Sequence, residues 1–206
     1  MKTIRVMLVD DHAVMRRGLA SLLETCPEIV VVGEAGDGAT ALKRVKTANP
    51  DLVIMDLLMP KMNGTETTRR IRELYPQVQV LVLTTFGSSD DITQAFSAGA
   101  NGAILKTAEL PELRKAIKQV ASGKHYISDE IEQIMTSDPP LPELSHRQIE
   151  ILDSITRGLS NPDIARQLGI SVPMVKEHMT ALLLKLGAAN RAEAIAIALR
   201  KHLLKI

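Results

Sequence analysis

Five polar residues in the first half of the chain share one feature: each lies at the end of a short apolar run. They are Asp10, Asp11, Asp56, Thr84 and Lys106. If the runs are strands of one parallel sheet, their carboxyl ends meet at the same edge, where such sheets place their reactive groups. Three close carboxylates repel one another and call for a cation, and ligands that are all oxygen are typical of Mg²⁺.

A carboxylate in this setting is able to attack phosphorus and form an acyl phosphate. We predict that Asp56 is this phosphoacceptor, because it lies on the central strand. Mg²⁺ and Lys106 would neutralise the equatorial oxygens of the phosphoryl group, and Thr84 would donate a hydrogen bond to it. The sequence therefore predicts a phosphorylation site in which Asp10, Asp11 and Asp56 surround Mg²⁺.

The runs that position these residues alternate with helical patterns. The five predicted strands are Ile4–Val9, Ile29–Val32, Leu52–Met55, Val78–Leu83 and Ala103–Leu105. The stretches between them repeat apolar residues at spacings of three and four, as crossover helices do. We therefore expect an α/β fold with a five-stranded, parallel, doubly wound sheet.

The chain after about residue 122 shows no strand pattern. A short helix is predicted at Asp129–Met135, followed by a proline-rich linker at Thr136–Pro142, since prolines do not fit inside a helix. The four helical stretches that follow are about 145–157, 161–168, 171–186 and 190–203. The expected domains are 3–122, a linker with a short helix at 123–142, and an all-α four-helix domain at 143–206.

Four motifs of the first domain carry a resemblance: Leu8-Val-Asp-Asp, Met55-Asp-Leu-Leu-Met-Pro-Lys-Met-Asn-Gly, Leu83-Thr-Thr and Leu105-Lys106. Together they resemble the receiver domain of two-component response regulators. The resemblance implies that a sensor histidine kinase phosphorylates Asp56 and that Thr84 and Lys106 sense the phosphate. It also implies that Asp11, Asp56 and the backbone carbonyl of Leu58 hold Mg²⁺, with Asp10 acting mainly through water.

The sequence departs from the receiver pattern at two positions. Asn63 stands where aspartate is common, which should matter little because both residues tolerate turn conformations. Receivers usually have an aromatic residue about three positions before the lysine, and this chain has Ala103. The usual switch, in which the aromatic ring follows the threonine, therefore cannot operate in its common form. Two alternatives stay open: signalling through the loop Thr84–Asp91 and the following helix alone, or substitution by Phe86.

The second domain carries its own resemblance. Leu144-Ser-His-Arg-Gln-Ile-Glu-Ile-Leu, Gly158-Leu-Ser-Asn, Leu168-Gly-Ile-Ser and Val175-Lys-Glu-His resemble the LuxR-type helix-turn-helix domain, so the whole chain resembles a NarL/FixJ-type regulator. Helix 171–186 would enter the major groove of double-stranded promoter DNA. The resemblance places Lys176, Glu177 and Thr180 at base edges and Asn161 and Lys185 at the DNA backbone. Met174 and Pro162 replace polar residues common in this family and predict weaker binding.

The distribution of charge agrees with the expectation that only the second domain binds DNA. Residues 1–143 carry 16 lysines and arginines against 19 acidic residues, whereas residues 144–206 carry 9 against 5, so only the second part is basic. The N-terminal apolar run is too short for a signal peptide or a membrane span, so we expect a cytoplasmic protein without membrane contact. The apolar residues of helix 190–203 suggest a homodimer in the active state.

We expect a regulator that accepts phosphate on itself and is not an enzyme. The main alternative is a phosphorylation-independent DNA-binding regulator with an atypical receiver, which the alanine at position 103 favours and the acidic cluster disfavours. A phosphohydrolase would have a second aspartate two residues after Asp56, where Leu58 stands. An adaptor that uses its helical domain to bind only proteins is a further possibility.

Overall fold

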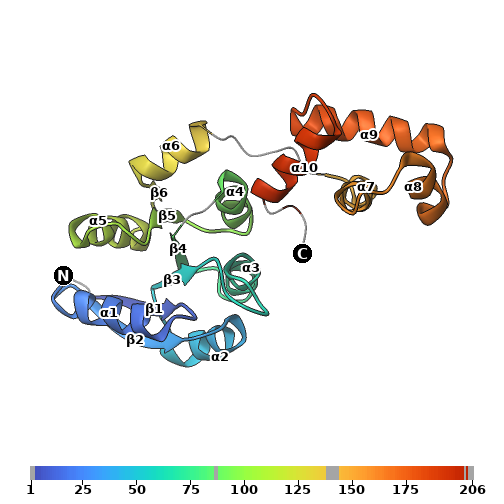
Figure 1. The fold of residues 1–206 in the computed structure, drawn as a ribbon. Coiled ribbons are helices and arrows are strands. Elements are labelled where there is room, and N and C mark those ends of the chain that lie inside the picture. Colours follow the sequence, from blue (N-terminus) through green and yellow to red (C-terminus); the bar gives the residue numbers. More distant parts are fainter. Residues whose placement is uncertain (1–2, 86–87, 138–143, 202, 204–206) are drawn as a thin grey trace. The chain divides into compact units, whose positions relative to one another are not determined.

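The computed structural model describes residues 3–85, 88–137, 144–201 and 203 (Figure 1). The first part is built on a parallel sheet with strand order β2-β1-β3-β4-β5-β6. Its strands are β1 (Ile4–Val9), β2 (Ile29–Ala35), β3 (Leu52–Asp56), β4 (Gln79–Thr84), β5 (Gly102–Leu105) and β6 (Tyr126–Ile127). The five predicted strands and their parallel arrangement are confirmed, and β6 is an addition.

Helices cover both faces of this sheet. They are α1 (Ala13–Glu24), α2 (Gly38–Ala48), α3 (Gly64–Leu74), α4 (Ser89–Ser97), α5 (Leu110–Ala121) and α6 (Asp129–Ser137). Helices α1 and α5 pack on one face. Helices α2 and α3 pack on the other, with α4 and α6 farther along towards β5. The result is the three-layer doubly wound fold that the alternating pattern predicts.

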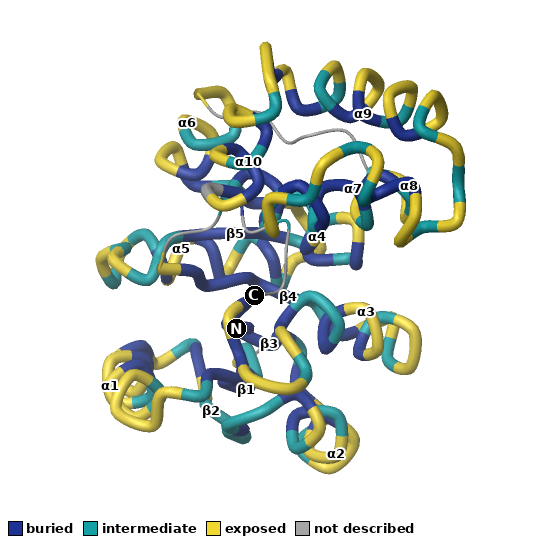
Figure 2. The backbone as a smooth tube through the Cα atoms, turned by 45° about the vertical axis from the view of Figure 1, so that its right-hand side comes forward, coloured by how far each residue is buried: buried dark blue, intermediate teal, exposed yellow. Residues whose placement is uncertain are grey.

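Alternation along the strands explains why both faces are covered. Successive side chains of a strand point to opposite faces. In β1, Val6 and Leu8 join the core under α1 and α5, whereas Met7 and Val9 join the core under α2 and α3. Figure 2 shows the central strands in the colour of buried residues and the outer faces of the helices as exposed. Strands buried on both faces are continuously apolar, as Leu52–Met55 of β3 and Val80–Leu83 of β4 are.

The segment after α5 extends the sheet. Tyr126 and Ile127 pair in parallel with Gly102 and Ala103, which makes β6 the neighbour of β5. Helix α6 then packs against β5, with Ile131 fully buried. Two residues are too few to show a strand period, so the sequence predicted only the helix here. The segment Tyr126–Ser137 is therefore part of the α/β unit.

The second part consists of α7 (His146–Thr156), α8 (Asn161–Leu168), α9 (Val172–Leu186) and α10 (Arg191–Arg200). Each begins at a side chain that accepts a backbone hydrogen bond; these caps are Ser145, Ser160, Ser171 and Asn190. Gly169 ends α8 with φ 64°, a left-handed conformation that favours glycine, and α9 begins at Val172. The predicted all-α domain of four helices is thus observed.

The chain divides into two compact units, Met1–Pro139 and Pro140–Ile206. The division falls inside the predicted proline-rich linker, of which residues 138–143 lie outside the described part. The boundaries proposed at 122/123 and 142/143 stay predictions. Among the described residues, no helix has both the length and the apolar content needed to cross a membrane.

An ion-pair cluster fastens α5 to the start of β2 and gives a testable prediction. The carboxylate of Glu28 accepts from Arg114 and lies 2.7 Å from Lys118 Nζ. These bonds lower the pKa of Glu28 to about 2 from its usual 4.5. A lowered pKa contributes stability above pH 4.5 that is lost as the pH falls towards about 2.

We therefore expect Glu28→Gln to lower the urea midpoint at pH 7, and the difference from wild type to shrink below pH 4.5. Tyrosine fluorescence reports on the first unit alone, because the chain has no tryptophan and its two tyrosines are Tyr75 and Tyr126. Glu24→Gln is the control, since this carboxylate is exposed. A difference that persists undiminished at roughly pH 2.5, about 2 units below the usual pKa of a glutamate, would contradict the assignment to ionised Glu28.

Candidate functional site

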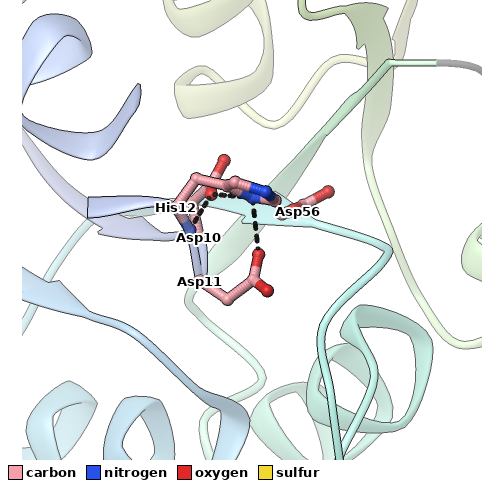
Figure 3. Close-up of side chains that lie close together, drawn as sticks. All are labelled: Asp10, Asp11, His12 and Asp56. Carbon is pink, nitrogen blue, oxygen red and sulfur yellow. Dashed lines mark hydrogen bonds and ion pairs between the residues drawn. The ribbon is translucent and has the colours of Figure 1, made fainter. Parts of the chain in front are cut away.

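The predicted carboxylates lie at the point where the strand order reverses. β1 has β2 on one side and β3 on the other, and ligands of such sheets bind beyond the carboxyl ends at this switch point. Val9 pairs with Met55, so the next residues, Asp10 and Asp56, lie at the same level. Figure 3 shows Asp10, Asp11, His12 and Asp56 gathered there. One ligand atom of each lies within 4.8 Å of those of the others.

Lys106 joins two of these carboxylates. Its Nζ lies 2.6 Å from Oδ2 of Asp10 and 2.8 Å from Oδ2 of Asp56. All three side chains are almost completely buried, with exposed fractions of 6, 7 and 3% respectively. A buried ammonium between two carboxylates compensates charges that would otherwise be costly in the protein interior. The structure thus brings Asp10, Asp56 and Lys106 into one buried ion cluster.

The Oδ1 atoms of the three aspartates differ in their surroundings. Oδ1 of Asp10 accepts from the backbone N–H of His12 at 2.7 Å, and Oδ1 of Asp56 accepts from that of Leu58 at 3.2 Å. The buried Oδ1 of Asp11 accepts no hydrogen bond from the described residues. His12 Nδ1 is 2.8 Å from this oxygen, but the two form an ion pair only when the imidazole is protonated.

These residues fit a hard divalent cation. A cation takes carboxylate oxygens as ligands, and oxygens of Asp10, Asp11 and Asp56 lie within 4.8 Å of one another. Buried polar atoms are normally satisfied, and the buried Oδ1 of Asp11 accepts no hydrogen bond from the described residues and has only the exposed imidazole of His12 beside it, so it is available to a cation. The backbone carbonyl of Leu58, predicted as a further ligand, stays a prediction.

Burial and charge shift the pKa values of the cluster. Burial raises the pKa of Asp56, and the neighbouring Lys106 opposes this effect. Burial would lower the pKa of Lys106, but its bonds to Asp10 and Asp56 prevail and raise it above 10.5. The lysine therefore stays charged at neutral pH, and it opposes the effect of burial on Asp56 by favouring the ionised, nucleophilic form of that carboxylate.

Thr84 lies next to this cluster in the sheet. Asp56 pairs with Leu83, the neighbour of Thr84, and Thr84 pairs with Leu105, the neighbour of Lys106. The Thr84 hydroxyl is buried and has no hydrogen-bond partner among the described residues. An unused donor at this position fits the predicted role in sensing phosphate, because a phosphoryl oxygen would satisfy it.

Position 103, where receivers usually have an aromatic residue, is covered by neighbouring apolar side chains in this protein. Ala103 is 1% exposed and shares its apolar cluster with Ile92 of α4 and Ile131 of α6, while Ile127 of β6 pairs beside it. Side chains of the β6–α6 segment therefore cover the strand where the aromatic ring would lie. Phe86, the predicted substitute, lies outside the described residues.

The loop after Asp56 passes very close to the main chain of this residue. Asn63 caps α3 through its side chain, which accepts from the backbone of Glu66, so the asparagine fulfils the role of the more common aspartate. Gly64 follows at the helix start, and its N–H donates to the Leu57 carbonyl at 2.9 Å. A Cβ at position 64 would lie 2.0 Å from the backbone oxygen of Asp56. Only glycine permits this approach.

In the second unit, α9 divides into two faces. Val175, Met179, Leu182 and Leu186 are buried in the core with residues of α7, α8 and α10. Lys176, Glu177 and Thr180 lie outside this core, and all three are exposed. The three residues predicted to read bases thus share the solvent side of the second helix of the helix-turn-helix, which is the element that enters a major groove.

The two residues predicted to contact the DNA backbone, Asn161 and Lys185, are less exposed than those predicted to read bases. Lys185 Nζ donates to Oε1 of Gln148 at 3.1 Å, which joins α9 to α7. Asn161 begins α8 and is partly buried. Arg191 donates to the carbonyl of Leu159 and so fastens α10 to the turn before α8. The structure gives Lys185 and Arg191 roles inside the domain, and DNA contact by Lys185 stays a prediction.

Two residues near the acidic site escaped the sequence prediction. His12 places its imidazole against Asp11, and the only signal is that it directly follows the two aspartates. Arg16, near the start of α1, donates to the backbone carbonyl of Asp10 at 2.6 Å. No motif marked this arginine, because its partner is a backbone atom.

Fold and site define a receiver domain joined to a helix-turn-helix domain, and comparison with known families agrees. Residues 6–118 match the response regulator receiver domain, and residues 142–198 match the bacterial regulatory proteins of the luxR family. The chain belongs to the two-component response regulators with a LuxR-type DNA-binding domain. These are transcriptional regulators rather than enzymes.

Relatives of similar length support this membership. The chain is 36% identical over 208 residues to the transcriptional regulatory protein LiaR of Bacillus subtilis (strain 168), covering 97% of this chain and 99% of LiaR. It is 37% identical to the crystal structure of the response regulator ChrA of a heme-sensing two-component system, with a TM-score of 0.61 and coverage of 99 and 100%.

The fold is also shared with an RcsB–DNA complex, with 22% identity, a TM-score of 0.72 and coverage of 97 and 99%.

Proposed function

We propose that this protein is controlled by phosphorylation of Asp56 by a sensor histidine kinase and that phosphorylation alters its binding to promoter DNA. The observation that supports this most directly is the convergence of Asp10, Asp11 and Asp56 with Lys106 at the switch point of the sheet. A domain used only for dimerisation has no physical need for three mutually repelling carboxylates. This argues against the phosphorylation-independent alternative.

The proposed reaction is one phosphoryl transfer to the protein itself. An Oδ atom of Asp56 attacks phosphorus, a bond forms between this oxygen and phosphorus, and the bond from phosphorus to the donor breaks. Lys106 holds positive charge beside the accepted group, and the unpartnered hydroxyl of Thr84 donates to a phosphoryl oxygen. Asp10 keeps Lys106 in place from the other side.

Mg²⁺ is the proposed cofactor. Asp10, Asp11, Asp56 and the Leu58 carbonyl are the groups that would hold it, Asp10 mainly through water. When bound, it would neutralise part of the negative charge on the carboxylates and on the phosphoryl oxygens. The oxygens of Asp10, Asp11 and Asp56 that lie within 4.8 Å of one another support this assignment.

The proposed partners are a sensor histidine kinase, double-stranded promoter DNA and a second copy of the chain. The exposed face of α9 and the DNA-bound relative of the same fold support DNA as a partner. Ala192 and Leu199 are exposed apolar residues of α10, seven positions apart and so on one helix face, which supports a homodimer in the active state. We propose a cytoplasmic location, where promoter DNA is accessible.

Phosphorylation is tested by incubating the full chain with acetyl phosphate and Mg²⁺ and measuring its intact mass. Wild type is expected to gain one phosphoryl group and Asp56→Asn to gain none. Asp129→Asn is the matched control, because this aspartate is exposed at the start of α6, and it is expected to gain the group as wild type does. No gain by wild type at any Mg²⁺ concentration would favour the phosphorylation-independent alternative.

DNA recognition gives a further prediction. Lys176→Ala is expected to weaken binding to a duplex enriched by the wild-type protein from a random pool by about 1–3 kcal/mol and to relax discrimination among sequences, if the lysine reads a base. Arg157→Ala removes the same charge from an exposed position of another helix and is expected to leave discrimination unchanged. Titrations at several salt concentrations separate the two effects. Equal discrimination in both variants would contradict base reading by Lys176.

A further inference from the structure

Arg16 makes a connection between three elements around the acidic site. It lies in α1, its Nη1 donates to the Asp10 carbonyl at 2.6 Å, and its Nε lies 3.2 Å from Oε2 of Glu34 in β2. Its side chain is only 18% exposed. The guanidinium therefore links α1 to the residue that follows β1 and to Glu34 near the end of β2.

The Asp10 carbonyl lies where the main chain leaves β1, and a hydrogen bond there would fix the direction of the chain. β1 ends at Val9, so this carbonyl lies beyond the strand, and it belongs to the peptide that joins Asp10 to Asp11. The Asp10 side chain is already fixed by Lys106 and by the His12 backbone. Arg16 fixes the main chain of the same residue, and a charged donor gives a stronger hydrogen bond than a neutral one.

Asp11 depends on this support. Its buried Oδ1 accepts no hydrogen bond from the described residues, and its neighbour His12 Nδ1, at 2.8 Å, belongs to an imidazole that is 71% exposed and is carried by the same main chain. The orientation of the Asp10–Asp11 peptide therefore decides where the Asp11 carboxylate points. Removal of a group that holds a metal-ligating residue in place through hydrogen bonds typically changes the affinity for the metal.

We propose that Arg16 is a positioning residue that holds the Asp10–Asp11 peptide so that the Asp11 carboxylate is aimed at the Mg²⁺ site. Glu34 holds the guanidinium in place from the neighbouring strand. This inference rests on the proposed phosphorylation function and assigns it a residue that touches neither phosphate nor metal.

The test is a calorimetric titration of the full chain with MgCl₂ without any phosphodonor. Arg16→Met is expected to raise the dissociation constant for Mg²⁺ by roughly 10–100-fold, the usual consequence of losing such a supporting contact. Arg17→Met is the matched control, since this neighbouring arginine is exposed, and its dissociation constant is expected to equal that of wild type. Arg16→Lys is expected to lie between, because an ammonium still donates to the carbonyl but lacks the fork that reaches Glu34.

Urea unfolding without Mg²⁺, followed by tyrosine fluorescence, separates positioning from stability. A purely structural Arg16 would lower the urea midpoint and leave the Mg²⁺ dissociation constant of the folded protein unchanged, and that result would overturn the proposal. If Arg16→Met does not fold, Glu34→Gln replaces it: a raised dissociation constant supports the proposal and an unchanged one overturns it.

Different results would overturn the proposed function and the proposed role of Arg16. If wild type is not phosphorylated by acetyl phosphate, the proposed function fails. If wild type binds Mg²⁺ and is phosphorylated while Arg16→Met binds Mg²⁺ equally well, only the role of Arg16 fails.

Discussion

Lys106→Met is expected to destabilise the first unit by about 3–5 kcal/mol at neutral pH without Mg²⁺, as is usual when one partner of a buried ion pair is removed. The variant leaves two buried carboxylates, Asp10 and Asp56, without the ammonium that lies 2.6 and 2.8 Å from them. The measurement is urea unfolding followed by tyrosine fluorescence. Lys43→Met, an exposed lysine of α2, is the control and should stay within about 0.5 kcal/mol of wild type.

The pH dependence adds a second criterion. The pKa of Lys106 is raised in the folded protein, so its contribution is complete below the unfolded value of 10.5 and is lost as the pH rises through the higher, folded value. The stability difference between wild type and Lys106→Met should therefore close only above pH 10.5 on the alkaline side. A difference that disappears already at roughly pH 8–9, about 1.5–2.5 units below the usual pKa of a lysine, would show that another group is responsible.

Gly64→Ala is expected to destabilise the same unit by about 3 kcal/mol or more, at the upper end of what steric overpacking causes. The added Cβ would lie 2.0 Å from the Asp56 oxygen and 2.7 Å from Leu57 Cα, and both are main-chain atoms that move only with the strand. Because the displaced segment carries Asp56, the proposed phosphoacceptor, the rate of phosphorylation by acetyl phosphate should fall as well.

Gly18→Ala is the matched control for this substitution. Its Cβ would meet nothing within 4 Å, and Gly18 lies inside α1, so alanine should stabilise the helix by about 0.4–1 kcal/mol. Urea midpoints of both variants, read by tyrosine fluorescence, give the comparison. Equal midpoints for the two alanine variants would contradict the steric argument at position 64.

The acidic cluster was predictable because one rule applies to all its members. Polar residues at the carboxyl ends of parallel strands meet at one edge, so Asp10, Asp56 and Lys106 needed only their place along the chain. The two-unit organisation followed in the same way from the change of hydrophobic period and from the prolines near residue 140. The predicted helix starts at about 161 and 171 agree with the observed starts of α8 and α9, which Ser160 and Ser171 cap.

What the sequence did not show depends on contacts with backbone atoms or on very short elements. Arg16 binds a carbonyl, which carries no side-chain signature. Lys185 is a charged residue of a predicted DNA-binding helix, and only the fold shows that Gln148 accepts from it. β6 has two residues, and its pairing depends on tertiary contacts rather than on a local pattern.

The β6–α6 segment also sets the smallest fragment in which the receiver keeps its native surface. β6 covers the outer edge of β5, and α6 covers the apolar cluster that contains Val82, Ile92 and Ala103. A fragment that ended at residue 122 would present both an unpaired strand edge and an uncovered apolar patch, the two features that lead to edge-to-edge association. A fragment that ends after Ser137 keeps both closed. The chain between these positions therefore serves solubility as well as connection.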